Sequence, residues 1–402
     1  MREIMLTGKT IVLGVTGSIA AYKIANLTSM LTKLHADVHV LMTENATNFI
    51  NPITFETLTG HKCLVDTFDR NFNYNIEHVA LGTKADIALV APASANIIAK
   101  MAHGIADDML STTLLACKCK KIVAPAMNVN MYENPMTQAN IQKLRDFGMI
   151  VVEPETGMLA CKAVGKGKMP SENILLQYLL QEVQYEHDMT GENVLITAGP
   201  TREAIDPVRY LTNHSTGKMG YALATAAARR GANVTLISGQ TNLDTPLGVT
   251  RVDIESAADM FEEVSKRAGQ QDIIIKAAAV ADYTPQEFSD EKIKKKDGDY
   301  SVALKRTTDI LAWLGEHRQN GQFICGFSME TEHMLENSRK KLVEKNADMI
   351  VANNLRQEGA GFGVDTNIVT LITKGDCLEL PQMSKEEAAV KILDFIKKTK
   401  KA

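Results

Sequence analysis

Cys161 lies in a stretch of unusual composition, EPETGMLACKAVGKGKMP (residues 153–170). Because Gly157, Gly165 and Gly167 leave the backbone conformationally permissive, we predict a mobile loop here rather than a packed strand or helix. An unperturbed thiol is mostly protonated at pH 7 and can therefore donate a proton. Cys161 is either an idle thiol on a loose loop or a reactive group on a lid, and the other motifs must distinguish these interpretations.

Small hydroxyl and amide residues follow several apolar runs in the first half of the chain, which include TIVLGV, DVHVLM and DIALVA. In an open parallel sheet, ligands bind beyond the carboxyl ends of the strands, so these residues would share one edge. Each could be an ordinary helix cap, as predicted for Ser18 and Ser94, but together they favour a phosphorylated, nucleotide-like cofactor. The first turn lacks G-x-G-x-x-G, which disfavours a dinucleotide. The residues are Gly17, Ser18, Thr43, Ser94 and Asn96.

The second half holds a candidate phosphate-binding turn, in which Gly199 and Thr201 follow an apolar run and NHSTGKMG leads into a helix at about Met219. The P-loop pattern is absent, and alone this motif would be a glycine-rich turn with a capped helix. KAAAVADYTP is interpreted as a strand ending at Asp282, whose carboxylate suits a metal-bridged triphosphate. EKIKKKDGD forms a basic loop, which alone is typical of a solvated face. Its lysines are Lys292, Lys294, Lys295 and Lys296.

These residues need a scaffold, and apolar runs alternate with helical patterns along the whole chain, which predicts α/β domains with mainly parallel sheets. The first helix is expected from Ile19 to about Lys33, and further strands at NVTLIS, DIIIKAAAV, FICGFS and DMIVAN. The polar stretch at 183–193 is interpreted as a linker, after which GENVLITAGP echoes GKTIVLGVTG. We therefore predict two Rossmann-like domains, residues 1–190 and 191–402.

Composition limits the class of protein. The chain has 402 residues, 45% of them hydrophobic and 23% charged, as in globular proteins of two or three domains. A net charge of −4 does not indicate the basic surface that nucleic-acid binding requires. We expect neither a signal peptide nor a membrane span, and a cytoplasmic location. The six cysteines are sparse, and CKC has no matching pair, which disfavours a disulfide framework or a zinc site.

Motifs in both halves resemble a known family. GSIAAYK, PASANIIAK…GIADD, PAMNVNMY and the cysteine-bearing stretch resemble the flavin-dependent cysteine decarboxylases. The whole chain resembles the bacterial bifunctional phosphopantothenoylcysteine decarboxylase/phosphopantothenate–cysteine ligases of coenzyme A synthesis. Tyr132 stands where the family often carries tryptophan, so an aromatic side chain is kept. The resemblance implies a flavodoxin-like flavin domain followed by a nucleotide-binding ligase domain.

For the first domain, the resemblance implies FMN held by Gly17, Ser18, Thr43, Ser94, Asn96 and Met127. It also implies that His78 is the active-site histidine, which without the family would more often be structural, that Asn128 holds the substrate carboxylate, and that Cys161 is an acid. Oxidation of the substrate thiol to a thioaldehyde supplies an electron sink for loss of CO2. The resulting enethiol is then reduced, and this step needs a proton at carbon.

For the second domain, the resemblance implies a ligase that joins 4′-phosphopantothenate to cysteine through an acyl-cytidylate formed from CTP with Mg2+. Asn213 would act on that intermediate, Lys292 on the triphosphate, and Asp282 on the metal. Trimeric flavin domains and dimeric ligase domains are also implied. The remaining nucleotide residues implied are Thr307, Thr308, Asp309, Ile310, Phe327, Lys341 and Lys345.

Two alternatives come from other classes of protein. One is a flavin-binding regulatory subunit, against which the set of His78, Asn128 and Cys161 argues. The other is a decarboxylase of cysteine-ending peptides, which would lack the second half of this chain.

Overall fold

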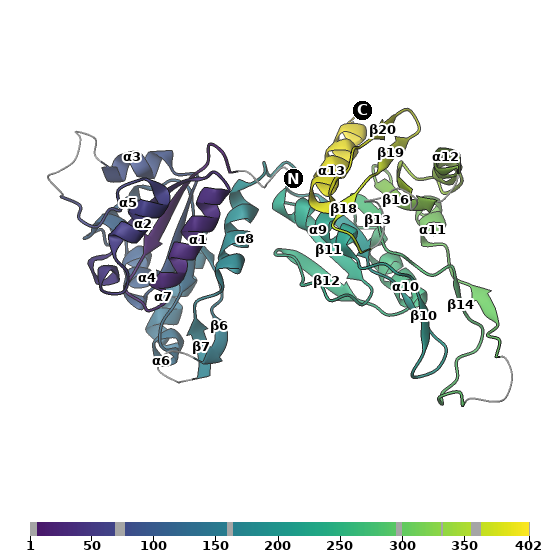
Figure 1. The fold of residues 1–402 in the computed structure, drawn as a ribbon, viewed down its shortest axis with the longest axis horizontal. Coiled ribbons are helices and arrows are strands. Elements are labelled where there is room, and N and C mark those ends of the chain that lie inside the picture. Colours follow the sequence, from purple (N-terminus) through teal and green to yellow (C-terminus); the bar gives the residue numbers. More distant parts are fainter. Residues whose placement is uncertain are drawn as a thin grey trace. The chain divides into compact units, whose positions relative to one another are not determined.

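The computed structural model describes residues 6–68, 77–158, 164–294, 300–330, 333–354 and 363–401. The chain divides into two compact units between Glu186 and His187 (Figure 1). Each unit is a sheet with helices on both faces. Among the described residues, no helix has the length and apolar character that crossing a membrane requires.

The first unit is built on a five-stranded sheet whose strands all run parallel, in the order β2-β1-β3-β4-β5. This is the flavodoxin-like order, as predicted. Every residue of β1 and β3 is buried, because helices cover both faces of these central strands. The strands are β1 (Thr10–Val15), β2 (Asp37–Met42), β3 (Ile87–Ala93), β4 (Lys120–Pro125) and β5 (Ile150–Val151).

Alternate residues of β1 belong to two separate cores, one on each face of the sheet. Leu13 packs with α1 (Ala21–Lys33), α2 (Pro52–Thr59) and α8 (Glu172–Val183). Val12 packs with the helices of the opposite face, as expected from the two-residue period of a strand. These helices are α3 (Glu77–Lys84), α4 (Ala95–His103), α5 (Met109–Ala116) and α7 (Pro135–Asp146), and the short helices are η1 (Glu44–Asn48) and α6 (Val129–Glu133).

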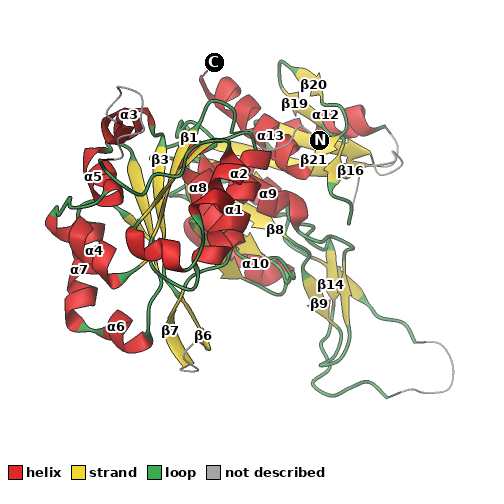
Figure 2. Cartoon of the chain, turned by 60° about the vertical axis from the view of Figure 1, so that its left-hand side comes forward, coloured by secondary structure: helices red, strands yellow, loops and turns green. Residues whose placement is uncertain are grey.

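The stretch around Cys161 departs from the prediction. Strands β6 (Glu155–Met158) and β7 (Val164–Lys168) pair as an antiparallel hairpin, shown in Figure 2. The prediction of a mobile loop is therefore wrong for both arms, and Cys161 itself lies outside the described residues. Gly167 is required by packing, because a Cβ there would lie 2.4 Å from the carbonyl oxygen of Met127.

The second unit has an eight-stranded sheet in the order β12-β11-β8-β13-β16-β17-β19-β20. Its first six strands are parallel and follow the Rossmann order, with the topological switch between β8 and β13. The predicted mainly parallel sheet is confirmed. The strands are β8 (Asn193–Ala198), β11 (Asn233–Ser238), β12 (Val249–Asp253), β13 (Ile273–Lys276), β16 (Phe323–Glu330), β17 (Met349–Asn354), β19 (Thr370–Thr373) and β20 (Cys377–Glu379).

Two cores flank this sheet as well. Helices α9 (Lys218–Arg229) and α13 (Lys385–Lys401) cover one face, and α10 (Ala257–Ala268), α11 (Ile310–Glu316) and α12 (Met334–Glu344) cover the other. Three short antiparallel strand pairs, β9–β10, β14–β15 and β18–β21, lie outside the main sheet, and β9 and β14 of two of them lie side by side (Figure 2). These strands are β9 (Arg202–Ala204), β10 (Tyr210–Thr212), β14 (Tyr283–Pro285), β15 (Leu304–Arg306), β18 (Thr366–Asn367) and β21 (Met383–Ser384).

Strand β13 ends earlier than predicted, at Lys276 instead of Asp282. Beyond it, the amides of Ala278 and Ala281 donate to the hydroxyls of Thr197 and Thr201 at 3.1 and 3.0 Å. These side-chain acceptors draw residues 277–282 out of the sheet. The segment therefore lies as a loop over the switch point.

Candidate active sites

In the first unit, the turns after β1 and β3 are joined at the carboxyl edge of the sheet. The Thr16 hydroxyl donates to the carbonyl of Pro92 at 2.6 Å and accepts from the amide of Ser94 at 3.0 Å. Gly17 allows close approach, because a Cβ there would lie 3.0 Å from the Cβ of Asn45. The predicted residues Gly17, Ser94 and Thr43 therefore follow neighbouring strands at one edge.

The predicted helix cap is confirmed for Ser94 at α4 and is wrong for Ser18 at α1. Ser94 is the N-cap of α4 and its hydroxyl accepts from the amide of Ile97 at 3.4 Å, while Asn96 is exposed in the first turn. Ser18 does not cap α1, whose N-cap is Ala20 with no side-chain cap. The Ser18 hydroxyl instead accepts from the amide of Ala20 at 3.3 Å, a local turn that precedes the helix.

Thr43 offers the clearest sign of a ligand. Its Oγ1 is buried and has no hydrogen-bond partner among the described residues, although Thr43 is the N-cap of η1 and its amide donates to the carbonyl of Val15 at 3.0 Å. A buried hydroxyl without a partner costs free energy, which a ligand oxygen or nitrogen would offset. The strand-end residues thus fit a polar cofactor at this edge.

The PAMN segment follows β4 and is fastened to the hairpin. The amide of Met127 donates to the carbonyl of Gly167 at 3.1 Å, and a Cβ on Gly165 would lie 2.9 Å from a methyl carbon of Val129. Asn128 is the N-cap of α6, and its Oδ1 accepts from the amide of Asn130 at 2.9 Å. Strand β7 therefore brings the cysteine-bearing hairpin to the segment that carries Asn128.

His78 is placed on a separate element. It lies in the first turn of α3 with a half-buried side chain. Within the described ranges, no hydrogen bond or ion pair joins it to Asn128 or to the strand-end residues. A role for His78 beside Asn128 therefore stays a prediction.

In the second unit, three predicted residues meet at the switch point. The Asn213 amide donates from Nδ2 to the carbonyl of Ala279 at 3.0 Å. The Thr307 hydroxyl donates to the carbonyl of Ala281 at 2.6 Å, and the Thr307 amide donates to Asp282 at 3.0 Å. Residues 277–282 thus connect Asn213 with the TTDI motif, and the Asp282 side chain is exposed beside them.

A second group of predicted residues surrounds the start of α11. Asp309 caps this helix by accepting from Ala312 at 3.0 Å, and its other oxygen pairs with Lys345 at 3.0 Å. Burial acts to raise the pKa of Asp309, but the Ala312 amide and the Lys345 ammonium hold it below its usual value. Lys341 donates to the carbonyl of Phe327 at 3.3 Å. Thr308 is exposed and Ile310 is buried in the core.

Among the described residues of the basic loop, Ile293 is held by hydrogen bonds. The amide of Ile293 donates to buried Asp206 at 3.2 Å, and Arg209 donates to the carbonyl of Ile293 at 3.0 Å. Lys292 and Lys294 are exposed on either side. The loop's other two lysines, Lys295 and Lys296, lie outside the described residues.

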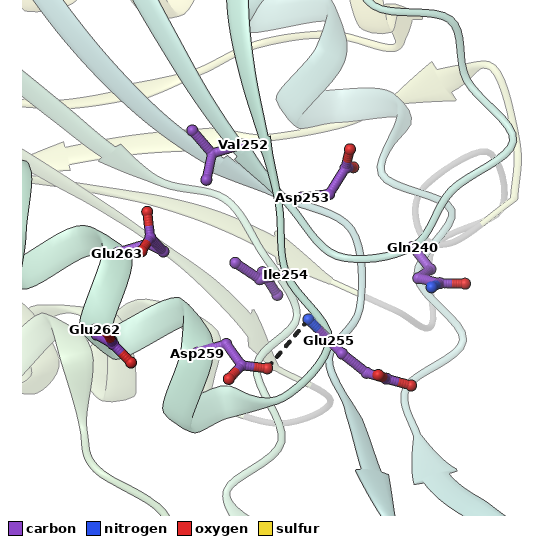
Figure 3. Close-up of a pocket in the computed structure, with 8 residues that line it drawn as sticks. All are labelled: Gln240, Val252, Asp253, Ile254, Glu255, Asp259, Glu262 and Glu263. Carbon is purple, nitrogen blue, oxygen red and sulfur yellow. Dashed lines mark hydrogen bonds between the residues drawn. The ribbon is translucent and has the colours of Figure 1, made fainter.

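An acidic pocket lies at the far side of the same sheet edge, at the end of β12 and the start of α10 (Figure 3). Its volume is about 510 Å³, and five of its eight lining residues are carboxylates. This lining repels a polyphosphate, which favours the lysine-bearing end at β13 and β16 as the nucleotide site. The lining residues are Gln240, Val252, Asp253, Ile254, Glu255, Asp259, Glu262 and Glu263.

One residue of the second site was missed by sequence reasoning. Lys276 ends β13 at the switch point, and the charged groups that act on it include Lys341, Lys345, Asp309 and Asp282. The sequence itself marks Lys276 as unusual, because a lysine inside the apolar run DIIIKAAAV is rare for a buried strand.

Comparisons with known proteins match both units. The family model described as "Flavoprotein" matches residues 2–184, and the one described as "DNA/pantothenate metabolism flavoprotein C-terminal domain" matches residues 189–399. The coenzyme A biosynthesis bifunctional protein CoaBC of Bacillus subtilis is 49% identical over 399 residues, 98% of this chain and 97% of that protein. The chain belongs to this family. The Escherichia coli K12 member is 41% identical over 394 residues, 97% of each chain.

Solved structures resemble the two units separately. The C-terminal domain of a coenzyme A biosynthesis bifunctional protein CoaBC is 45% identical, with a TM-score of 0.46, and the match covers 53% of this chain and 97% of that one. The FMN-dependent cysteine decarboxylase SpaF is 33% identical, with a TM-score of 0.37, and the match covers 44% of this chain and 99% of that one.

Membership of the family excludes the two alternatives. The identity to bifunctional coenzyme A biosynthesis proteins runs through both units, so the second half that a peptide decarboxylase would lack is present. The chain is a bifunctional enzyme of coenzyme A biosynthesis.

Proposed function

We propose that the chain carries out two consecutive steps of coenzyme A synthesis. Residues 191–402 ligate 4′-phosphopantothenate with cysteine at the expense of CTP. Residues 1–190 decarboxylate the resulting 4′-phosphopantothenoylcysteine to 4′-phosphopantetheine with FMN. The observation that carries this proposal is the 49% identity to a bifunctional coenzyme A biosynthesis protein through both units.

In the decarboxylase, this chain's residues bind, orient and protonate. FMN would be held at the carboxyl edge of β1–β3, where Gly17 permits close approach and the Thr43 hydroxyl has no partner among the described residues. When bound, FMN supplies the electron sink that a cysteine carboxylate lacks. Asn128, oriented through Asn130, hydrogen-bonds the substrate carboxylate without the strong attraction that would oppose CO2 loss. His78 is the histidine that would transfer a proton in this site.

In the ligase, the groups at the switch point activate a carboxylate. Lys292, Lys341 and Lys345 would bind the triphosphate of CTP, and Asp282 would hold the Mg2+ that offsets its charge. Displacement of pyrophosphate by the 4′-phosphopantothenate carboxylate gives an acyl-cytidylate. Asn213, held by Ala279, orients this intermediate, and the amine of cysteine then displaces CMP. Activation is needed because an unactivated carboxylate has a strongly basic leaving oxide.

Self-assembly is part of the proposal, with trimeric flavin domains and dimeric ligase domains. Ile19 and Tyr22, which are 60% and 61% exposed directly after the Gly17-Ser18 turn, are large apolar side chains that a partner subunit would cover. We infer a cytoplasmic location, which the sparse and irregularly spaced cysteines support.

Replacing Thr43 with valine is expected to weaken FMN binding about tenfold, because one hydrogen bond of ~1–1.5 kcal/mol is lost while the shape is kept. Titration of FMN into flavin-free protein, followed by fluorescence quenching, measures this. Thr57→Val is the matched control, because the Thr57 hydroxyl is exposed and donates only to Ile53 on α2. Equal affinities of the two variants would remove Thr43 from the cofactor site.

The whole proposal is tested by adding 4′-phosphopantothenate, cysteine, Mg2+ and each nucleotide triphosphate in turn. Pyrophosphate and CO2 are followed together. Both should appear with CTP, pyrophosphate first, and the purified protein should be yellow. Pyrophosphate without CO2 would overturn the decarboxylase half, and CO2 only from supplied 4′-phosphopantothenoylcysteine would overturn the ligase half.

A further inference from the structure

Lys276 occupies the centre of the second sheet edge. In register, it lies between Thr197 of β8 and Gly326 of β16, at the topological switch. Ile273 and Ile275 belong to the core under α9 and α13, whereas Ile274 belongs to the core under α10, α11 and α12. Because strand side chains alternate, Lys276 emerges on the same face as Ile274, towards α11 and α12.

Helix α11 is pressed against this end of the sheet. A Cβ on Gly326, the strand neighbour of Lys276, would lie 2.6 Å from Leu311 of α11. A Cβ on Gly315 would lie 2.0 Å from the carbonyl oxygen of Lys345. These two close contacts hold α11, the end of α12 and the end of β13 together around one group of charges.

The charges in this group do not balance. Lys276, Lys341 and Lys345 contribute three ammonium groups, and Asp309, already paired with Lys345, and exposed Asp282 contribute the carboxylates. In the part of the chain that the structure describes, the half-buried Lys276 side chain has no hydrogen bond or ion pair. Burial and then the Lys341 ammonium lower the pKa of Lys276 to about 8. A half-buried ammonium group without a partner lowers the stability of the folded protein, and a bound anion would offset this free-energy cost.

We propose that Lys276 is a further binding residue of the ligase site, which contacts a phosphate oxygen of the bound nucleotide triphosphate. This inference rests on the proposed ligase function. A polyphosphate placed between Lys276, Lys341 and Lys345 would pair the Lys276 ammonium, which has no partner among the described residues. Lys276 therefore contributes to nucleotide affinity by charge.

The test is calorimetric titration of the full-length protein with CTP and Mg2+, without 4′-phosphopantothenate so that no turnover occurs. Lys276→Met, which keeps length and removes charge, should weaken binding at least about tenfold, while Lys276→Arg should stay within about threefold. Lys340→Met is the matched control, because Lys340 is 71% exposed on α12 and pairs only loosely with Glu344, at 3.8 Å. Its affinity should equal that of the wild type.

Proton uptake supplies a readout that a structural role would not change. At pH 8 Lys276 is partly deprotonated in the free protein, and phosphate contact raises its pKa, so CTP binding should take up about half a proton. Titrations in two buffers of different ionisation enthalpy measure it. Uptake should vanish in both Lys276→Met and Lys276→Arg, although the arginine variant keeps its affinity, and it should persist in Lys340→Met.

The pH dependence of stability provides a further test of the Lys276 charge. The pKa of Lys276 is lower in the folded protein than in the unfolded chain. The charged side chain therefore destabilises the folded protein fully below pH 8, and this destabilisation disappears as the pH rises towards 10. Lys276→Met should therefore raise the unfolding temperature of the nucleotide-free protein at pH 7, and this gain should shrink at pH 10. Wild-type CTP affinity and proton uptake in Lys276→Met would overturn the inference. A wild-type protein that binds no CTP would overturn the proposed ligase function instead.

Discussion

Replacing Asn213 with aspartate is expected to leave pyrophosphate release intact and to slow amide formation by about 10²–10³-fold, the usual effect of losing one donor to a developing charge. The Asn213 amide reaches the loop at the switch point by donating to Ala279. A carboxylate cannot donate this bond, and it places a negative charge beside the acyl phosphate. Quenched-flow measurement of pyrophosphate and of 4′-phosphopantothenoylcysteine in the same reaction separates the two steps.

Asn233→Asp is the matched control for this variant. Asn233 is exposed at the start of β11, and its Nδ2 donates to Asn193 at 3.2 Å, away from the switch point. Its two rates should equal those of the wild type. A wild-type rate of ligation in Asn213→Asp would refute the role of Asn213, and an equal loss of pyrophosphate release would move that role to the first step.

The strands that carry the sites were predictable because they are buried on both faces. TIVLGV, DIALVA and NVLITA read as continuous apolar runs since helices cover the central strands of each sheet. The polar residues after these runs were then placed by the rule that ligands bind at carboxyl ends. The structure brings Gly17, Thr43 and Ser94 to one such edge, as that reasoning required.

The errors arise where long-range contacts override local pattern. Residues 277–282 look like a continuation of β13, but hydroxyls of Thr197 and Thr201, some 80 positions earlier, capture their amides. Strand β12 was missed because it is short and half-exposed at the sheet edge. The significance of Lys276 depends on lysines 65 and 69 positions later in the sequence, which a local pattern cannot reveal.

The glycines around Cys161 are a second case in which long-range packing could not be predicted from local composition. Composition suggested that Gly165 and Gly167 loosen the chain, whereas they let β7 pack closely on Met127 and Val129. The hairpin is further fastened by Lys168, which pairs with Glu155 at 3.2 Å across its two strands. Strand β7, which follows Cys161 in the sequence, therefore packs beside the segment that carries Asn128, and this supports the proposal that the Cys161 thiol serves the decarboxylase.

Replacing Cys161 with serine is expected to leave the first release of CO2 from 4′-phosphopantothenoylcysteine largely intact, at one CO2 per bound FMN, because the two electrons taken from the substrate then stay on the flavin. Formation of 4′-phosphopantetheine should fall about 10²–10⁴-fold, the usual contribution of a general acid. A serine hydroxyl is a much weaker acid than a thiol, so it cannot protonate carbon in the final reduction. The unsaturated enethiol should accumulate. Mass spectrometry distinguishes it from the thiol product, which is heavier by the mass of H2.

Cys377→Ser provides the comparison, because Cys377 is exposed in β20 of the second unit and should not affect either product. Loss of CO2 together with the thiol product in Cys161→Ser would place Cys161 at an earlier step, in binding or in the first oxidation. Normal yields of 4′-phosphopantetheine would show that the Cys161 thiol has no role in the reaction. Enethiol accumulation in Cys161→Ser alone would establish that Cys161 is the proton donor of the final reduction.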